Sequence, residues 1–254
     1  PHVSLQAPKE EVAKYLGQFP EQPYLGYKGG YAPNKYPLAT YAAMITYIDT
    51  QVGEIFKLLK DLHLDQNTLV LFSSDNGAPP PGDNTPLRDF KATVYEGGIK
   101  SASFVNWPGH VPAGLSITEP MHIVDWYPTL IHLAGGKINQ PSTIDGKDVW
   151  PMITQNKKSP HDAILTVSTR GPVISAIRMD HWKLILLNTD SSTQKNKAFS
   201  KYESIALFNL LDDPSETNNL ANKYPERVQV MRKRLTEMLK DAVSSGTKGP
   251  EDEL

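Results

Sequence analysis

The segment Thr68–Ser74 constrains the fold more than any other part of the chain. It is an unbroken run of apolar and β-branched residues, and Asp75-Asn76-Gly77 ends it abruptly. Such runs are typical of strands that are buried on both faces of a sheet. Before this strand, apolar residues recur at three- and four-residue spacing from Tyr41 to Leu62, which predicts a long helix with one apolar face. A helix followed by a buried strand indicates a layered α/β fold.

The rest of the first 160 residues continues this alternation. Residues 1–38 and 78–98 are rich in Pro and Gly, and we predict loops there. The further predicted elements are a helical turn near Lys9–Leu16, a strand at Ser101–Trp107 and a helix at Ile123–Ala134 that stops at Gly135-Gly136. We therefore assign residues 1–160 to one α/β domain.

The pattern changes after about residue 160. Four short segments are alternating or rich in β-branched residues, and they predict strands at Ala163–Thr169, Val173–Met179, His181–Leu187 and Ala206–Leu210. The second and third are close enough to form a hairpin around Met179-Asp180. Apolar residues from Val228 to Leu239 then follow helical spacing. Residues 161–254 should therefore form a small antiparallel sheet with one C-terminal helix.

Composition excludes several classes of function. The 26 Lys and Arg residues nearly balance the 28 Asp and Glu residues, so no basic excess points to nucleic acid. No apolar run reaches the roughly 18 residues of a membrane span. There is no cysteine, which excludes disulfides and thiolate metal sites in this stretch. The start, Pro1–Pro8, lacks the basic and apolar regions of a signal peptide, and we expect it to continue from a longer sequence.

Asp75 and Asn76 are candidate metal ligands because they directly follow the predicted strand. In parallel α/β sheets, ligands bind beyond the carboxyl ends of the strands. A carboxylate beside a carboxamide offers two hard oxygen ligands, which suit Ca²⁺ or Mg²⁺. However, Asp-Asn-Gly is also an ordinary turn sequence, and two ligands do not complete a shell of roughly six to eight oxygens. The residues alone leave both a metal site and a simple turn open.

Three other residues have both a structural and a functional interpretation. Lys91 lies in a Gly-rich loop, where an ammonium group is ordinarily solvated, but near a metal it can bind an anion or protonate a leaving group. His2 lies in a Pro-rich loop, where a lone histidine is ordinarily structural. For Arg88 we favour bracing of its own loop over binding of an anion.

Several segments, in this order and spacing, together resemble the arylsulfatase family of the alkaline phosphatase superfamily. The C-terminal portions of arylsulfatase B-like and bacterial polysaccharide sulfatases are especially similar. The matching segments are His2–Pro8, Leu71–Gly77, Pro86–Gly98, Trp107–Gly109, Asp125–Gly135, Asp145-Gly146, Trp182–Leu184 and Leu207–Leu220. The resemblance implies the C-terminal part of an alkaline-phosphatase-like mixed sheet sandwiched by helices. Two positions depart from the family pattern: Asp89 stands where glycine is common, and Lys100 where arginine is usual.

The resemblance also implies roles for individual residues. Asp75 and Asn76 would bind Ca²⁺, with Mg²⁺ as the alternative. Lys91 would bind the sulfate and assist the leaving group, and His2 would hydrogen-bond the sulfate ester. The family's nucleophile is a formylglycine made within a Cys/Ser-x-Pro-x-Arg motif, which is absent from these 254 residues. It would lie in an N-terminal part of the same sulfatase, so we expect this chain to be inactive by itself.

The implied activity is hydrolysis of a sulfate ester on a sulfated glycan or an aryl sulfate. One alternative is a phosphodiesterase or phosphonate hydrolase of the same superfamily, because a metal and a lysine also bind other tetrahedral anions. Another is a non-catalytic binding module derived from a sulfatase. The implied partners are the substrate and the N-terminal part, without nucleic acid or membrane. The implied compartment is the periplasm or the exterior rather than the lysosome, and the chain has no Asn-x-Ser/Thr sequon.

Overall fold

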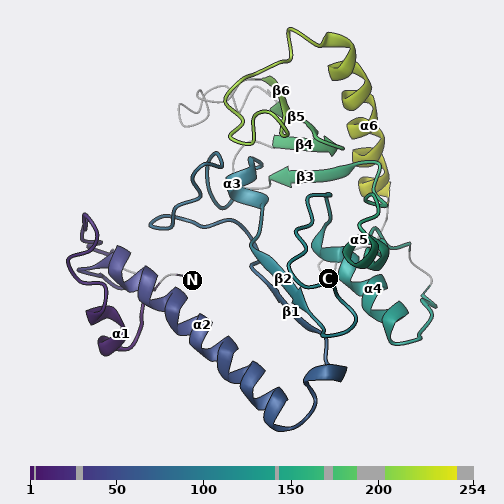
Figure 1. The fold of residues 1–254 in the computed structure, drawn as a ribbon. Helices are drawn as coiled ribbons and strands as arrows, with labels where there is room; N and C mark the ends of the chain where they lie inside the picture. The colour runs from purple at the N-terminus through teal and green to yellow at the C-terminus, as the bar shows by residue number, and fades with distance from the viewer. Residues whose placement is uncertain (3, 27–30, 141–142, 169–173, 188–203, 245–254) are drawn as a thin grey trace, which may run out of the picture. The chain divides into compact units, whose positions relative to one another are not determined.

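The computed structural model describes residues 1–254 except 3, 27–30, 141–142, 169–173, 188–203 and 245–254 (Figure 1). The chain divides into two compact units. Unit 1 comprises residues 1–85, 89–91 and 97–113, and unit 2 comprises residues 86–88, 92–96 and 114–254. The chain therefore passes between the units several times near Lys91. The domain boundary at residue 160 stays a prediction. No described helix is both long and apolar enough to cross a membrane.

Unit 1 is built around one long helix and a two-stranded sheet. Its elements are α1 (Lys9–Ala13), α2 (Pro37–Asp61), the 3₁₀ turn η1 (Asp65–Asn67), β1 (Val70–Ser73) and β2 (Ser103–Asn106). A single helical turn, α3 (Glu96–Ile99), begins in unit 2 and ends in unit 1. The two strands pair antiparallel, with Leu71 opposite Val105. These elements confirm the helices and strands predicted for this part, except that α3 was predicted as loop.

The N-terminus of α2 is held by a carboxylate from the preceding loop. Glu21 accepts hydrogen bonds from the backbone N–H groups of Leu38 and Ala39, at 3.0 and 2.8 Å. Pro37 occupies the first turn, where its missing N–H removes no helical hydrogen bond. A negative group at this end also complements the helix dipole. The start of α2 is thus determined by a residue that lies well outside the helix.

The apolar face predicted for α2 is not its buried face. The buried residues of the helix lie at its N-terminal end: Pro37, Ala39, Thr40 and Ala43. Side chains of the predicted face remain exposed farther along, including Ile45, Ile48, Ile55 and Leu62. The periodic pattern therefore identified the helix correctly, but the residues that the structure describes bury the stripe only in part.

Strand β1 is also less buried than its sequence suggests. Val70, Leu71 and Phe72 are half-buried and Ser73 is exposed, whereas the apolar run predicted burial on both faces. Among the described residues β1 pairs with β2 alone, in a two-stranded sheet. Phe72 stacks on Phe104 of β2 at a centroid distance of 5.3 Å. One neighbouring strand cannot enclose both faces, which explains the partial exposure.

Unit 2 contains the antiparallel sheet that the sequence predicts. The sheet order is β3-β4-β5-β6, all antiparallel. Its strands are β3 (Ile164–Ser168), β4 (Ile174–Met179), β5 (Trp182–Leu187) and β6 (Ile205–Asn209). The helices of the unit are α4 (Trp126–Leu133) after the turn η2 (Ile123–Asp125), α5 (Trp150–Gln155) and α6 (Pro225–Ser244). The hairpin at Met179-Asp180 is confirmed, whereas the predicted strand ends at 169 and 173 lie outside the described residues.

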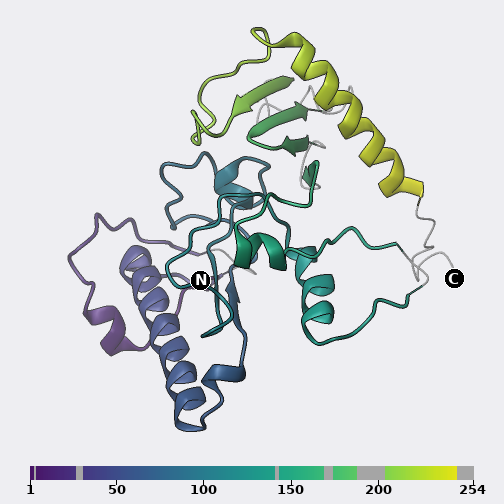
Figure 2. The ribbon, with the colours of Figure 1, turned by 45° about the vertical axis from the view of Figure 1, so that its right-hand side comes forward.

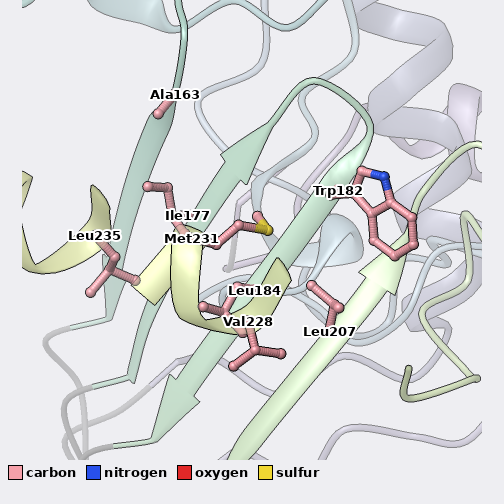
Figure 3. Close-up of a cluster of buried hydrophobic side chains, with 8 residues drawn as sticks. All are labelled: Ala163, Ile177, Trp182, Leu184, Leu207, Val228, Met231 and Leu235. Atoms are coloured by element: carbon pink, nitrogen blue, oxygen red, sulfur yellow. The ribbon is translucent and has the colours of Figure 1, made fainter. Parts of the chain in front are cut away.

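Both faces of this sheet are packed. Figure 2 shows α6 lying along one face. Ile177, Leu184 and Leu207 lie opposite one another on that face and contact Val228, Met231 and Leu235 of the helix (Figure 3). Side chains alternate between faces along a strand, so the intervening residues point the other way. These include Ala176, Ile185, Ala206 and Phe208, which pack with Val94 and Tyr95.

Candidate functional site

The Asp75-Asn76-Gly77 segment is held against the Glu-Gly-Gly motif. The Gly77 N–H donates to the carbonyl of Gly98 at 2.9 Å. Gly77 is buried, and a Cβ at this position would overlap the carbonyl oxygen of Gly97. Only glycine permits this approach of two backbones. The structure therefore brings together two motifs that are separate in the sequence, and it fixes the backbone next to both candidate metal ligands.

The side chains of Asp75 and Asn76 are available to an ion. Asp75 is exposed and Asn76 is half-buried. In the described part of the chain, neither side chain has a hydrogen bond or ion pair to another residue. Their carboxylate and carboxamide oxygens suit a hard cation such as Ca²⁺. The described residues contain no group of three or more Asp, Glu or His placed to hold a metal, so these two side chains would supply only part of a calcium shell.

Lys91 lies in the same unit as Asp75 and Asn76, between two residues with left-handed backbones. Asp89 has φ 63° and Ala92 has φ 73°. Glycine adopts this conformation freely and aspartate tolerates it. This explains why Asp89 can stand at a position where the family usually has glycine. Lys91 is half-buried and forms no ion pair with any residue that the structure describes. Non-glycine residues with a left-handed backbone often occur in functional loops. Here two of them, Asp89 and Ala92, flank Lys91.

His2 is exposed in unit 1 and lies beside an aromatic ring. Its imidazole approaches Tyr31 edge-on, with a centroid distance of 6.1 Å. Tyr31 belongs to a segment whose next residue, Ala32, donates its N–H to Ser4 Oγ at 3.3 Å. The segment around His2 therefore lies against the segment around Tyr31. Its contact with a sulfate ester stays a prediction.

Arg88 braces its loop, as we predicted from the sequence. Its guanidinium donates to the backbone carbonyl of Glu216 at 2.8 Å and lies 4.1 Å from the ring centroid of Tyr95. Both partners belong to unit 2, as does Arg88. A cation over an aromatic face adds electrostatic attraction to the packing. Arg88 therefore braces its loop through contacts with other residues of unit 2.

A buried ionic cluster in unit 2 was not predicted. The Lys183 ammonium lies 3.0 Å from Glu96 Oε1 and 2.8 Å from Glu216 Oε1, and all three side chains are almost fully buried. The contact with Glu216 is an ion pair without hydrogen-bond geometry. Glu216 Oε2 accepts the N–H of Glu96 at 2.6 Å. The one sequence signal was a lysine inside the apolar strand Trp182–Leu187, and it did not reveal the partners.

The C-terminal motif around Asp213 builds the turn that presents Glu216. Asp213 accepts backbone hydrogen bonds from Thr217 and Asn218 at 2.9 and 2.8 Å. Glu216 has a left-handed backbone with φ 51°. Asn219 then accepts from the N–H of Leu207 at 3.0 Å, which attaches the turn to β6. The motif therefore positions the carboxylate of Glu216 next to Lys183 of β5.

Stability should fall with rising pH because of Glu216. Burial raises the pKa of Glu216 above its ordinary value of 4.5, against the lowering effect of the Lys183 ammonium. The unfolded chain loses this proton first as the pH rises, so the contribution is complete below about pH 4.5 and disappears through the raised pKa. Glu216→Gln does not titrate, so the variant should lack this component. Urea unfolding of the wild type and of Glu216→Gln between pH 4 and 8 measures the free energy of unfolding at each pH. The same pH dependence in both proteins would contradict the prediction.

Comparisons with known proteins agree with these motifs. The family model described as Sulfatase matches residues 1–136, and N-sulphoglucosamine sulphohydrolase, C-terminal, matches residues 89–244. Arylsulfatase J of Mus musculus is 35% identical over 239 residues, covering 80% of this chain and 40% of the relative. A sulfatase of Formosa agariphila is 30% identical over 247 residues, covering 89% and 41%.

A solved structure is similar over nearly the whole chain. The crystal structure of Ps i-CgsB in complex with k-i-k-neocarrahexaose superposes with a TM-score of 0.78 and 30% identity. The match covers 94% of this chain and 48% of that protein. The chain therefore spans about two fifths to one half of the length of these relatives.

Proposed function

Because this chain belongs to the sulfatase family, we propose that it supplies the metal-binding and leaving-group side of an active site that hydrolyses sulfate esters. One observation carries the proposal. Asp75, Asn76 and Lys91 lie in one compact unit, and their side chains have no partner within the described residues. Charged groups that serve only structure are typically paired when buried, as Lys183 is. Lys91 is half-buried without an ion pair among the described residues, so its ammonium is suited to an anionic substrate, and the exposed carboxylate of Asp75 is accessible to an ion.

Asp75 and Asn76 would hold a calcium ion through their side-chain oxygens. When bound, the ion would stabilise negative charge on the sulfate oxygens as a Lewis acid. A shell of roughly six to eight oxygens requires more ligands than this pair. We propose that the others, and the formylglycine nucleophile, come from an N-terminal part of the same protein. The chain alone should therefore be inactive.

Lys91 would act on both the sulfate and the leaving group. Its ammonium is a compact charge that attracts the sulfate oxygens. As the bond between sulfur and the bridging oxygen breaks, the electron pair stays on that oxygen, and Lys91 would donate a proton to it. The resulting amine would regain a proton from water. His2 would donate a hydrogen bond to the ester and keep it in place.

The proposed substrate is a sulfated carbohydrate, with an aryl sulfate as a simpler analogue. Ps i-CgsB, which is 30% identical over the match, binds k-i-k-neocarrahexaose, and this supports a carbohydrate substrate for the present chain. The location that we propose, from the resemblance to sulfatases, is the periplasm or the exterior of the cell.

Calcium binding and substrate choice together test the proposal in the intact protein. Asp75→Ala should weaken calcium binding at least tenfold in isothermal titration, because the loss of a charged ligand leaves an incomplete shell. Asp49→Ala is the matched control, since Asp49 is also an exposed aspartate of unit 1. The intact protein should hydrolyse an aryl sulfate faster than the equivalent aryl phosphate. Unchanged calcium affinity in Asp75→Ala, or a preference for the phosphate, would overturn the assignment.

A further inference from the structure

Asn84 joins the two segments that carry the candidate site residues. Its Oδ1 accepts the N–H of Ala78 at 2.9 Å, and its Nδ2 donates to the Ala78 carbonyl at 2.8 Å. The same Nδ2 donates to the carbonyl of Asp89 at 3.1 Å. Ala78 follows the Asp75-Asn76-Gly77 segment directly, and Asp89 lies two residues before Lys91. One carboxamide therefore connects the metal-ligand segment with the lysine segment, all within unit 1.

The loop between these segments has few backbone donors with which to organise itself. Residues Pro79, Pro80 and Pro81 have no N–H group. Asn84 compensates by pairing with both the N–H and the carbonyl of Ala78, as a neighbouring strand would. Asp83 supports this arrangement, because its Oδ1 accepts from the N–H and the hydroxyl of Thr85, at 2.8 and 2.6 Å.

The chemistry of the contacts requires an amide. The Asn84 side chain accepts one hydrogen bond through Oδ1 and donates two through Nδ2. Only asparagine and glutamine side chains combine a carbonyl acceptor with an NH₂ donor group. Aspartate would place a carboxylate oxygen against two carbonyl oxygens. A shorter side chain would leave the Ala78 and Asp89 groups without these partners.

We infer that Asn84 is a positioning residue that sets the separation between the calcium ligands and Lys91. The inference rests on the proposed function. Residues that orient metal ligands typically change metal affinity or activity by about 10- to 100-fold when they are removed. A residue that served only general stability would change unfolding without changing the calcium affinity of the folded protein.

Asn84→Ala in the intact protein tests this inference against Asn219→Ala. Asn219 is a matched control because its side chain also hydrogen-bonds to backbone groups, among them those of Leu207, Ala221 and Ile205, but lies in unit 2. Asn84→Ala should weaken calcium binding by at least tenfold in isothermal titration and lower kcat more than it changes KM. Asn219→Ala should lower the melting temperature and leave both quantities within about twofold of wild type. In the metal-free protein, amide exchange at Ala78 should accelerate in Asn84→Ala alone.

Two further variants separate the possible outcomes. Asn84→Asp keeps the size of the side chain if the alanine variant does not fold, and it should still lower kcat by about tenfold because the donors are lost. Wild-type calcium affinity and kcat in the folded Asn84 variants would overturn the positioning role, whereas loss of calcium binding in Asp75→Ala would leave the proposed function standing. Unchanged binding in Asp75→Ala would instead remove the proposed function itself.

Discussion

Replacing Lys91 with alanine should lower the turnover of the intact protein by about 10² to 10³-fold. The expected loss is large because the ammonium would stabilise charge that develops only as the sulfate ester breaks. The fold should survive, because Lys91 forms no ion pair among the described residues and its removal leaves no buried charge unpaired. The free energy of unfolding should stay within about 0.5 kcal/mol of wild type.

The leaving group makes this experiment specific. If Lys91 protonates the bridging oxygen, the defect should be larger for an alkyl sulfate than for a nitrophenyl sulfate, whose leaving group needs no proton. Lys60→Ala is the control, because Lys60 is an exposed lysine of unit 1 on α2. An equal defect with both substrates would limit Lys91 to sulfate binding. Wild-type turnover in Lys91→Ala would refute the proposed catalytic role of Lys91.

Replacing Lys183 with methionine should lower the free energy of unfolding by about 3 to 5 kcal/mol. Methionine fills much of the same volume, but the variant leaves Glu96 and Glu216 buried together without a cation. Removal of one partner from a buried ionic cluster costs far more than the cluster contributes to stability, because the remaining charges stay desolvated. Denaturation in urea, followed by circular dichroism, measures the loss.

Two comparisons identify burial as the cause. Lys158 pairs with Glu119 at 2.9 Å, but 83% of its side chain is exposed. Lys158→Met should therefore lower the free energy of unfolding far less than Lys183→Met does, because water screens an exposed ion pair. Adding Glu216→Gln to Lys183→Met should restore part of the lost stability by removing one of the uncompensated charges. Similar losses at Lys183 and Lys158 would show that the cluster is hydrated in solution.

Local sequence patterns predicted most of the helices and strands. The hairpin of β4 and β5 and the helices α2 and α6 follow from periodicity and turn residues, which depend on neighbours in the chain. The motifs also pointed to Asp75, Asn76 and Lys91, and the resemblance supplied their proposed roles. The structure adds that Gly77, which directly follows Asp75 and Asn76, packs against the Gly97-Gly98 backbone.

The contacts between residues far apart in the sequence, and the role of Asn84, were not predictable in the same way. Lys183 and Glu96 are separated by 87 positions, and Glu96 and Glu216 by 120. Asn84 was unremarkable in the sequence because turn-rich loops ordinarily contain asparagine. Only the tertiary structure shows that its carboxamide forms hydrogen bonds with both Ala78 and Asp89.

By itself, the sequence determined where most of the elements form, because helical and strand periodicities are set by backbone geometry over a few residues. Only the tertiary structure decided what those elements bury. The apolar stripe of α2 stays partly exposed and β1 stays half-buried, whereas the side chain of Lys183 is buried in unit 2. Burial depends on which distant segments pack against a face. The residue pattern within one segment does not identify those distant segments.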